Sequence, residues 1–276
     1  MVVFPNAKIN LGLNILRRRD DGFHDISTVM YPVGWSDVLE IVPGTGANST
    51  LTVTGRGVAC PPEKNLVMRA LNALREIATF PAVDIFLEKI IPDGAGLGGG
   101  SSDAAFTITT VNTLFSLGLT DEIMAETAAK VGSDCPFFIY NRPMLATGRG
   151  EILTPVEVEL VDYSLVMVKP AGCSVSTKTA YSGVTPRVPT LSVAEIIDRP
   201  TETWRSELVN DFEETVAAIH PTIDRIKGRL YEMGAVYSAM SGSGSAVFGI
   251  YPANISLKDL EKTFAGMDIY IQPAAK

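Results

Sequence analysis

The stretch that most constrains this chain is the glycine-rich segment PDGAGLGGGSSDAA, which begins at Pro92. It places Gly94, Gly96 and Gly98–Gly100 between a run with strand character and a run with helical periodicity. Glycine loses the most conformational freedom on folding and adds no side chain to the packing, so a cluster this dense indicates that another group approaches the backbone closely. The sequence therefore predicts a loop that joins a strand to a helix N-terminus.

Two known nucleotide-binding motifs match this loop only in part. Gly94, Gly96 and Gly99 have the spacing of the dinucleotide fingerprint, but that motif needs a second parallel strand and an acidic residue about 20 positions on. Here a second helix follows instead, and the acids at 121–122 suit its first turn. The P-loop motif requires a lysine where this chain has Gly100. Neither motif is therefore favoured.

A phosphate-binding loop is the interpretation that remains. Free N–H groups and a partial positive charge at a helix N-terminus attract phosphate, and the hydroxyls of Ser101 and Ser102 add donors. Asp103 either caps the helix or helps to hold Mg²⁺ near the phosphates. A tight strand-to-helix turn without a ligand would need one or two glycines rather than this cluster, so phosphate binding is favoured.

The periodicity of the remaining chain predicts an α+β fold. Strands come first and helices later, without regular β-α-β alternation. Expected strands are 7–16, 27–33, 36–42, 51–55, 82–91, 133–140, the pair around the turn ATGRGE (146–151), 163–170 and the two that flank the Gly/Ser loop 241–245. Expected helices are 60–77, 104–115, 120–132, 191–197, 204–219 and 220–235, and 176–184 is a short helix or a loop.

Two of these expectations concern individual residues. The strand 7–16 alternates apolar with polar residues, so it should have one buried and one polar face. Within the helical segment 60–77, Asn65 is a plausible N-cap. Leu66, Ala70, Leu74 and Ile77 should lie together on one buried face of this helix.

Composition excludes several classes of protein. Hydrophobic residues make up 46% and charged residues 20% of the 276 residues, which is typical of a packed soluble protein. The formal net charge of -8 argues against a nucleic-acid or membrane-surface binder. Cys60, Cys135 and Cys173 lie far apart without a metal-binding spacing, and no signal peptide or membrane-spanning run is evident. We therefore expect a cytoplasmic protein.

Other candidate residues are ambiguous when each is taken alone. Lys8 lies on the polar face of the first strand, and Asp134 follows a helix stop; either could be an ordinary surface or turn residue. Phe23 and His24 lie in a loop, where they could stack on a base and hydrogen-bond to it, or simply form a hairpin. The second Gly/Ser loop, 241–245, is a substrate clamp or a flexible hairpin.

Taken together, these segments resemble the GHMP kinase superfamily. PDGAGLGGGSSDAA matches its central motif, and MSGSGSAVFG, from Met240, matches its C-terminal glycine loop. Within the superfamily, the resemblance is closest to kinases that act on a cytidine-diphosphate-linked sugar alcohol. It rests on NAKINLGLNILRRRDDGFHD, GSDCPFF, TGRGE and STKTAY, which occur in the expected order over nearly the whole chain.

The resemblance implies a two-domain fold, with an ATP-binding domain at 1–154 and a substrate domain at 155–276. It implies ATP-dependent phosphorylation of a hydroxyl in non-mevalonate isoprenoid synthesis, with Mg²⁺ bridging the ATP phosphates but no assigned metal ligands. Small molecules are the expected partners, without nucleic acid or membrane, and the expected oligomeric state is a monomer or a weak homodimer.

The resemblance also assigns roles to residues. Asp134 is the general base and Lys8 assists it. The residues expected to bind ATP are Asn65, Leu66, Pro92, Gly94, Ala95, Gly96, Leu97, Gly98, Gly99, Gly100, Ser101 and Ser102. The residues expected to bind the substrate are Asn10, Phe23, His24, Thr177, Tyr181, Gly242, Ser243 and Gly244, with two rings enclosing the cytosine and the histidine contacting its polar edge.

Two positions depart from the family pattern: Phe23 replaces a tyrosine and Asp25 replaces a glutamate. Phe23 keeps the stacking surface but lacks the phenol. Two alternatives remain, namely a kinase of the same superfamily that acts on homoserine, mevalonate or a sugar, and a nucleotide-binding sensor without activity. The base-recognition residues favour the cytidyl substrate over the first, and Lys8 with Asp134 argues against the second.

Overall fold

The computed structural model describes residues 1–57 and 60–275. The chain divides into two compact units, each assembled from separate segments. Unit 1 comprises Met1–Lys8, Gly34–Asp93 and Gly98–Arg142, and unit 2 comprises Ile9–Val33, Gly94–Leu97 and Pro143–Lys276. The glycine-rich loop therefore contributes residues to both units.

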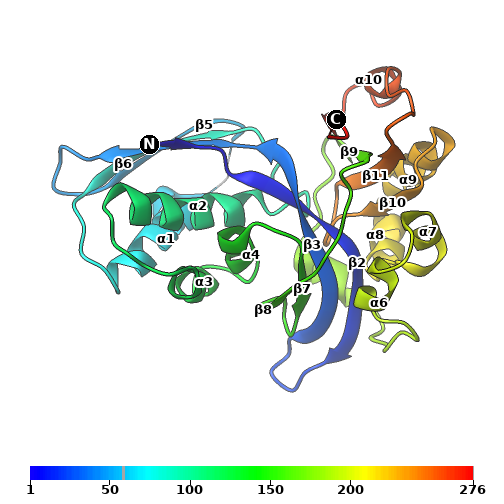
Figure 1. Cartoon of the computed structure of the whole chain (residues 1–276), viewed down its shortest axis with the longest axis horizontal. Coiled ribbons are helices and arrows are strands. Elements are labelled where there is room, and N and C mark those ends of the chain that lie inside the picture. The colour runs from blue at the N-terminus through cyan, green and yellow to red at the C-terminus, as the bar shows by residue number, and fades with distance from the viewer. Residues whose placement is uncertain (58–59, 276) are drawn as a thin grey trace. The chain divides into compact units, whose positions relative to one another are not determined.

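Unit 1 is a sheet with helices on one face. Its elements are β1 (Val2–Val3), β4 (Val38–Pro43), β5 (Thr50–Gly55), η1 (Pro62–Lys64), α1 (Leu66–Arg75), β6 (Val83–Lys89), α2 (Gly99–Leu114), α3 (Asp121–Ala129) and α4 (Cys135–Tyr140). The strand order is β1-β4-β6-β5, antiparallel except for the β5–β6 pair. Alternate residues such as Leu39, Ile41 and Ile85 are fully buried, and α1 and α2 lie along this side of the sheet (Figure 1).

Unit 2 contains most of β2 (Asn6–Arg18) and β3 (His24–Ser36). Its other elements are β7 (Met144–Thr147), β8 (Ile152–Pro155), β9 (Tyr163–Lys169), α5 (Thr177–Ser182), α6 (Val193–Ile197), η2 (Thr201–Thr203), α7 (Trp204–Glu207), α8 (Glu213–Ile219), α9 (Thr222–Glu232), β10 (Tyr237–Met240), β11 (Val247–Pro252), α10 (Leu260–Thr263) and β12 (Asp268–Gln272). Two sheets result, with the strand orders β2-β3-β7-β8 and β10-β11-β9-β12.

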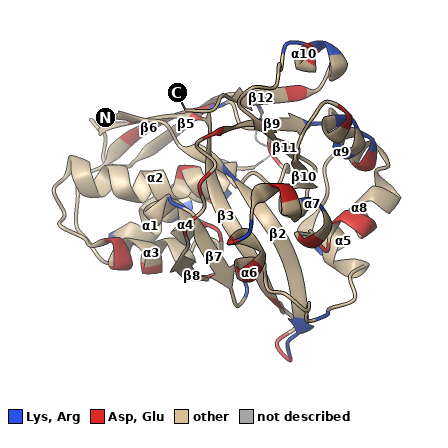
Figure 2. Ribbon diagram, turned by 45° about the vertical axis from the view of Figure 1, so that its right-hand side comes forward, with Lys and Arg blue, Asp and Glu red and all other residues tan. Residues whose placement is uncertain are grey.

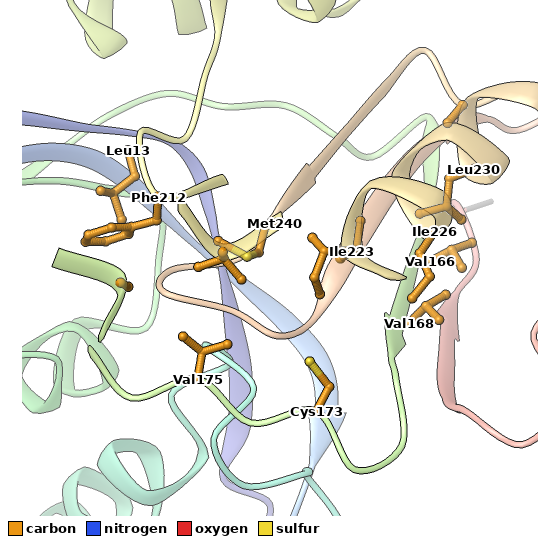
Figure 3. Close-up of a cluster of buried hydrophobic side chains, with 14 of the residues drawn as sticks. Leu13, Val166, Val168, Cys173, Val175, Phe212, Ile223, Ile226, Leu230 and Met240 are labelled. Atoms are coloured by element: carbon orange, nitrogen blue, oxygen red, sulfur yellow. The ribbon is translucent and has the colours of Figure 1, made fainter. Parts of the chain in front are cut away.

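The core of unit 2 fills the space between α9 and the second of these sheets. Ile223, Ile226 and Leu230 project from one face of α9 toward Val166 and Val168 of β9 (Figure 3). This one-sided burial confirms the amphipathic helix expected in 220–235, because residues three and four apart share a helix face. The mixture of sheets and helices likewise confirms the α+β class.

Several details of the structure differ from expectation. Residues 135–140 of the expected strand 133–140 form the helix α4 instead, since Pro136 at its start favours a helix and five consecutive residues are buried without alternation. Helix α1 ends at Arg75, which leaves Ile77 exposed. The expected helix 204–219 is broken into α7 and α8, where Asn210 hydrogen-bonds to the second Gly/Ser loop. Strands β1 and β12 and helix α10 gave no recognisable sequence signal.

A further difference concerns both faces of β2. Residues 7–15 are all buried, so the expected polar face is not exposed to solvent. Lys8 and Asn10 are 3% and 2% exposed, respectively. A buried polar group is unfavourable unless it is paired, so each of these side chains must have a partner.

Candidate active site

The glycine-rich loop leaves β6 and ends at the N-terminus of α2. Gly94, Gly96 and Gly98 have φ values of 59°, 73° and 72°, a backbone region that disfavours side chains. Gly98 is the N-cap residue of α2 and has no side chain to cap it. Ser102, in the first turn, is fully buried, and its Oγ has no hydrogen-bond partner within residues 1–57 and 60–275. The expected strand–loop–helix is confirmed, and its helix end has free polar groups.

The groups that approach these glycines belong mainly to the protein itself. A Cβ on Gly96 would lie 2.0 Å from the carbonyl oxygen of Ser241, and one on Gly94 would lie 2.7 Å from Ser174 Oγ. The Ser241 hydroxyl also donates to the Gly96 carbonyl at 2.8 Å, and the Ala246 N–H donates to Ala95. In unit 2 the second Gly/Ser loop therefore holds the first part of the glycine-rich loop. Asn10 lies beside Gly242 and donates its side-chain N–H to Thr28.

Gly100 differs from the other glycines of the cluster. It has an ordinary backbone conformation and is exposed, and an added Cβ would meet only Leu66 Cδ1 at 3.5 Å. The start of α1 therefore lies against the start of α2. Asn65 caps α1 as expected, with Oδ1 accepting the Val67 N–H at 2.9 Å. The structure thus brings the predicted adenine-binding residues Asn65 and Leu66 next to the glycine-rich loop.

Lys8 and Asp134 form an ion pair in unit 1. Lys8 Nζ lies 3.7 Å from Asp134 Oδ2; the lysine side chain is buried, whereas the carboxylate is 37% exposed. Burial lowers the pKa of Lys8, and Asp134 opposes that effect through its charge and a hydrogen bond. Asp134 does not cap α4 through its side chain, so its carboxylate has no structural task at that helix end.

This ion pair lies beside the last glycine of the loop. A Cβ on Gly98 would meet the Phe138 ring at 2.8 Å and Lys8 Cγ at 3.2 Å. The Lys8 stem and α4, which follows Asp134, therefore both lie against the residue that begins α2. Packing thus brings Lys8 and Asp134, which are 126 positions apart in sequence, to the N-terminus of α2.

Two of the base-recognition candidates, His24 and Tyr181, are in contact in unit 2. The rings of His24, at the start of β3, and Tyr181, on α5, stack with centroids 4.6 Å apart, and Phe212 contacts Tyr181 edge-on. Burial and the positive charge of Arg18 lower the pKa of His24, which favours the neutral imidazole at pH 7. A neutral imidazole has one N–H donor and one acceptor, as reading the polar edge of a base requires.

Phe23 and Thr177 have different surroundings. Phe23 is 54% exposed at the tip of the β2–β3 hairpin, where charged residues of both signs gather (Figure 2). Arg149 lies over its ring at 4.9 Å, a cation–π contact that sequence reasoning missed. Thr177 begins α5, which Ser176 caps. Asp25, the other departure from the family pattern, pairs with Arg17 and Arg19.

Sequence reasoning also missed a buried cluster of charged side chains in unit 1. Lys89, at the end of β6, contacts carboxylate oxygens of Asp37 and Asp103. Asp103 therefore neither caps α2 nor faces solvent, because its Oδ2 accepts from Lys89 at 2.7 Å. A lysine after a run of alternating strand residues, IFLEK, was the only local signal.

The pKa of Asp103 predicts how stability depends on pH. Burial raises this pKa to about 7, although the ammonium of Lys89 opposes the shift. A carboxyl with a raised folded-state pKa contributes stability that is complete below its unfolded pKa, near 4, and is lost as the pH rises through about 7. We expect the Asp103→Asn variant not to show this loss of stability, because an amide does not ionise.

The measurement is urea unfolding of both proteins from pH 4.5 to 8.5. The variant should gain free energy of unfolding relative to the parent by at most about 1.4 kcal/mol per pH unit, levelling off above pH 7. Groups that do not interact with Asp103 titrate equally in both proteins and cancel in the difference. If the difference in free energy of unfolding between the two proteins did not change with pH, Asp103 would ionise normally.

Among residues 1–57 and 60–275, no group of three or more His, Cys, Asp or Glu side chains could hold a metal ion. In the same residues no helix is long and apolar enough to cross a membrane.

Comparison with known proteins places the chain in a family. Residues 65–142 match the model of the GHMP kinases N terminal domain, and residues 193–262 match that of the GHMP kinases C terminal domain. Together they span more than half of the chain and contain both glycine loops. This chain belongs to the GHMP kinase family, whose members use ATP.

Its relatives within the family carry a more specific name. A 4-diphosphocytidyl-2-C-methyl-D-erythritol kinase of Parabacteroides distasonis is 50% identical over 259 residues, 94% of each chain. A solved 4-(cytidine 5'-diphospho)-2C-methyl-D-erythritol kinase is 31% identical with a TM-score of 0.82, covering 98% of both chains. The mevalonate kinase of Methanococcus jannaschii, 14% identical with a TM-score of 0.73 over 98% and 97% of the two chains, shares the fold alone.

Proposed function

We propose that this protein is an ATP-dependent kinase that phosphorylates the 2-hydroxyl of 4-diphosphocytidyl-2-C-methyl-D-erythritol in non-mevalonate isoprenoid synthesis. The observation that carries the proposal is the Lys8–Asp134 ion pair beside Gly98, at the helix end that the glycine-rich loop precedes. The names of the full-length relatives support the choice of substrate.

In the proposed reaction, the glycine-rich loop and the start of α2 hold the nucleotide phosphates, and Lys8 and Asp134 activate the hydroxyl. The first N–H groups of a helix have no intrahelical acceptor, and the buried Ser102 Oγ has no hydrogen-bond partner among residues 1–57 and 60–275, so both suit an anion. Asp134 orients the hydroxyl and takes its proton, while the Lys8 ammonium stabilises the negative charge of the transferring phosphoryl group. Phosphoryl transfer needs positioning and charge neutralisation more than covalent catalysis, and this residue set supplies both.

Mg²⁺ belongs to the proposal as a partner of ATP. Magnesium in kinases is held by substrate phosphates with one or two carboxylates and several waters, so a cluster of protein ligands is not required. Bound there, it would neutralise charge on the phosphates. We assign it no protein ligand.

Unit 2 residues are proposed to hold the cytidyl end of the substrate. His24 and Tyr181 present stacked rings, and Phe23 offers one ring face while Arg149 covers the other. Asn10, Thr177 and the loop Gly242–Gly244 complete the proposed substrate set. Homoserine and mevalonate have no base to stack on these rings, so the rings favour the cytidyl substrate over those alternatives.

We also propose that the chain acts in the cytoplasm as a monomer or a weak homodimer. Cys60, Cys135 and Cys173 are free thiols, as is usual in a reducing compartment. The sequence-based division at residue 154 remains our proposal for the domain boundary, and the two family models fall on either side of it. Sedimentation at several concentrations would measure the oligomeric state.

The proposed function is tested by ADP release with a panel of alcohols. With ATP and Mg²⁺, the cytidyl compound should be phosphorylated, whereas homoserine, mevalonate and simple sugars should give background rates. Phosphorylation of homoserine or mevalonate without turnover of the cytidyl compound would refute the proposed substrate. ATP binding without turnover of any alcohol would favour the sensor instead.

Replacing His24 with alanine tests the base-recognition set. The substitution removes the ring that stacks on Tyr181 and its hydrogen-bonding nitrogens, so KM for the cytidyl substrate should rise by about tenfold or more with little change in KM for ATP. His220→Ala, in the linker between α8 and α9, is the matched control. An unchanged KM in His24→Ala would remove this residue from the site.

A further inference from the structure

Three charged side chains of unit 1 are buried without a role in the proposed chemistry. Lys89, Asp37 and Asp103 are 6%, 0% and 2% exposed. Taking charges out of water costs several kcal/mol per ion, and a buried ion pair often stabilises no more than apolar residues of similar size. A cluster of three such groups is therefore poorly explained by stability alone.

The carboxylate of Asp37 holds the start of the glycine-rich loop. Its Oδ1 accepts the backbone N–H groups of Ile90 and Ile91 at 2.5 and 2.8 Å. These residues link the end of β6 to Pro92. Asp37 Oδ2 accepts from the Lys89 ammonium, so the same side chain ties the loop start to Lys89.

The carboxylate of Asp103 connects the same ammonium to the end of the loop. Asp103 lies early in α2, five residues beyond Gly98, and accepts from Lys89 Nζ at 2.7 Å. The ammonium also packs under the start of the helix, because a Cβ on Gly99 would lie 3.3 Å from Nζ. Lys89 therefore touches, directly or through Asp37, the residues on both sides of the glycine cluster.

We infer that Lys89 is a positioning residue for the nucleotide phosphates: through Asp37 and Asp103, its ammonium fixes the spacing between the start of the glycine-rich loop and the N-terminus of α2. Its ammonium donates to Asp37 and Asp103, so it acts on the loop backbone rather than on the phosphate. The inference rests on the proposed function in taking ATP as the ligand of this loop.

The test compares Lys89→Met with Lys169→Met. Lys169 is an equally buried lysine, 8% exposed, at the end of β9, and its side chain donates to the Pro170 carbonyl. The measurements are the Kd for ATP with Mg²⁺ by calorimetry, without the alcohol, then KM for each substrate, kcat and urea unfolding. Lys89→Met should raise the Kd and KM for ATP by about tenfold or more while KM for the alcohol stays within about twofold. Lys169→Met should leave all of these binding constants within about twofold.

A folded Lys89→Met variant with an unchanged Kd for ATP would overturn the inference, as would equal increases in both KM values. If Lys89→Met does not fold, the Kd for ATP of Asp103→Asn tests the inference instead. This substitution keeps the side-chain shape and the Lys89–Asp37 pair. An increase of about threefold or more in the Kd for ATP with an unchanged KM for the alcohol would support the inference, and an unchanged Kd would overturn it. Because ATP binding is measured without the alcohol, a wrong assignment of the alcohol does not affect this result.

Discussion

Replacing Asp134 with asparagine is expected to lower kcat by about 10²–10⁴-fold, the usual contribution of a general base. The amide has nearly the same shape but accepts no proton, and it ends the charge pairing with Lys8 at 3.7 Å. The protein should still fold, because the Asp134 side chain is 37% exposed and does not cap α4. KM for ATP should change little, since the loop and the helix N-terminus remain intact.

The measurement is steady-state kinetics together with a urea unfolding curve. Asp121→Asn, which changes an exposed aspartate in the first turn of α3, is the matched control and should retain full activity. Retention of more than about a tenth of the parent kcat by Asp134→Asn would leave Asp134 a positioning role at most. Loss of the cooperative unfolding transition would instead show that the ion pair is structural.

Alanine substitutions at Gly96 and Gly100 of the glycine cluster should have opposite effects on the free energy of unfolding. In Gly96→Ala the new Cβ would overlap the Ser241 carbonyl oxygen at 2.0 Å, at a φ of 73° that alanine disfavours. We expect a loss of about 3 kcal/mol or more of unfolding free energy, because strain and overpacking add. ATP binding should be lost together with the structure.

Gly100→Ala should fold at least as well as the parent. Its Cβ would make only an ordinary contact with Leu66, and alanine in a helix gains about 0.4–1 kcal/mol over glycine. If phosphate approaches this exposed backbone, the methyl group should raise KM for ATP by about tenfold without loss of stability. Urea unfolding and ATP kinetics on both variants check the pair, and an unchanged KM in Gly100→Ala would place the phosphates elsewhere on the loop.

Local signals account for the parts of the fold that the sequence predicted correctly. Asn65 caps α1, and the α9 periodicity buries Ile223, Ile226 and Leu230. Each of these features depends on residues within about one or two turns of helix, so it can be recognised from a short stretch of sequence. Helix α4 was missed because a short apolar run does not distinguish a buried helix from a buried strand.

For the site residues, the sequence indicated which residues take part but not how buried they are. The sequence motifs indicated Lys8, His24, Asp134 and Tyr181, and the structure pairs the first with the third and the second with the fourth. Alternation along β2 suggested an exposed Lys8, whereas it is buried with a lowered pKa. Periodicity reports which residues share a face but does not report what covers that face.

The sequence by itself determined that a glycine-rich loop joins a strand to a helix N-terminus, because positive φ angles and helix periodicity are properties of adjacent residues. Only the tertiary structure decided what approaches those glycines. Gly96 is needed mainly for the Ser241 backbone, 145 residues away, and the loop ends are tied through Lys89 to Asp37, 52 residues away. Burial and pairing at such separations depend on how the whole chain packs, and no local pattern encodes them.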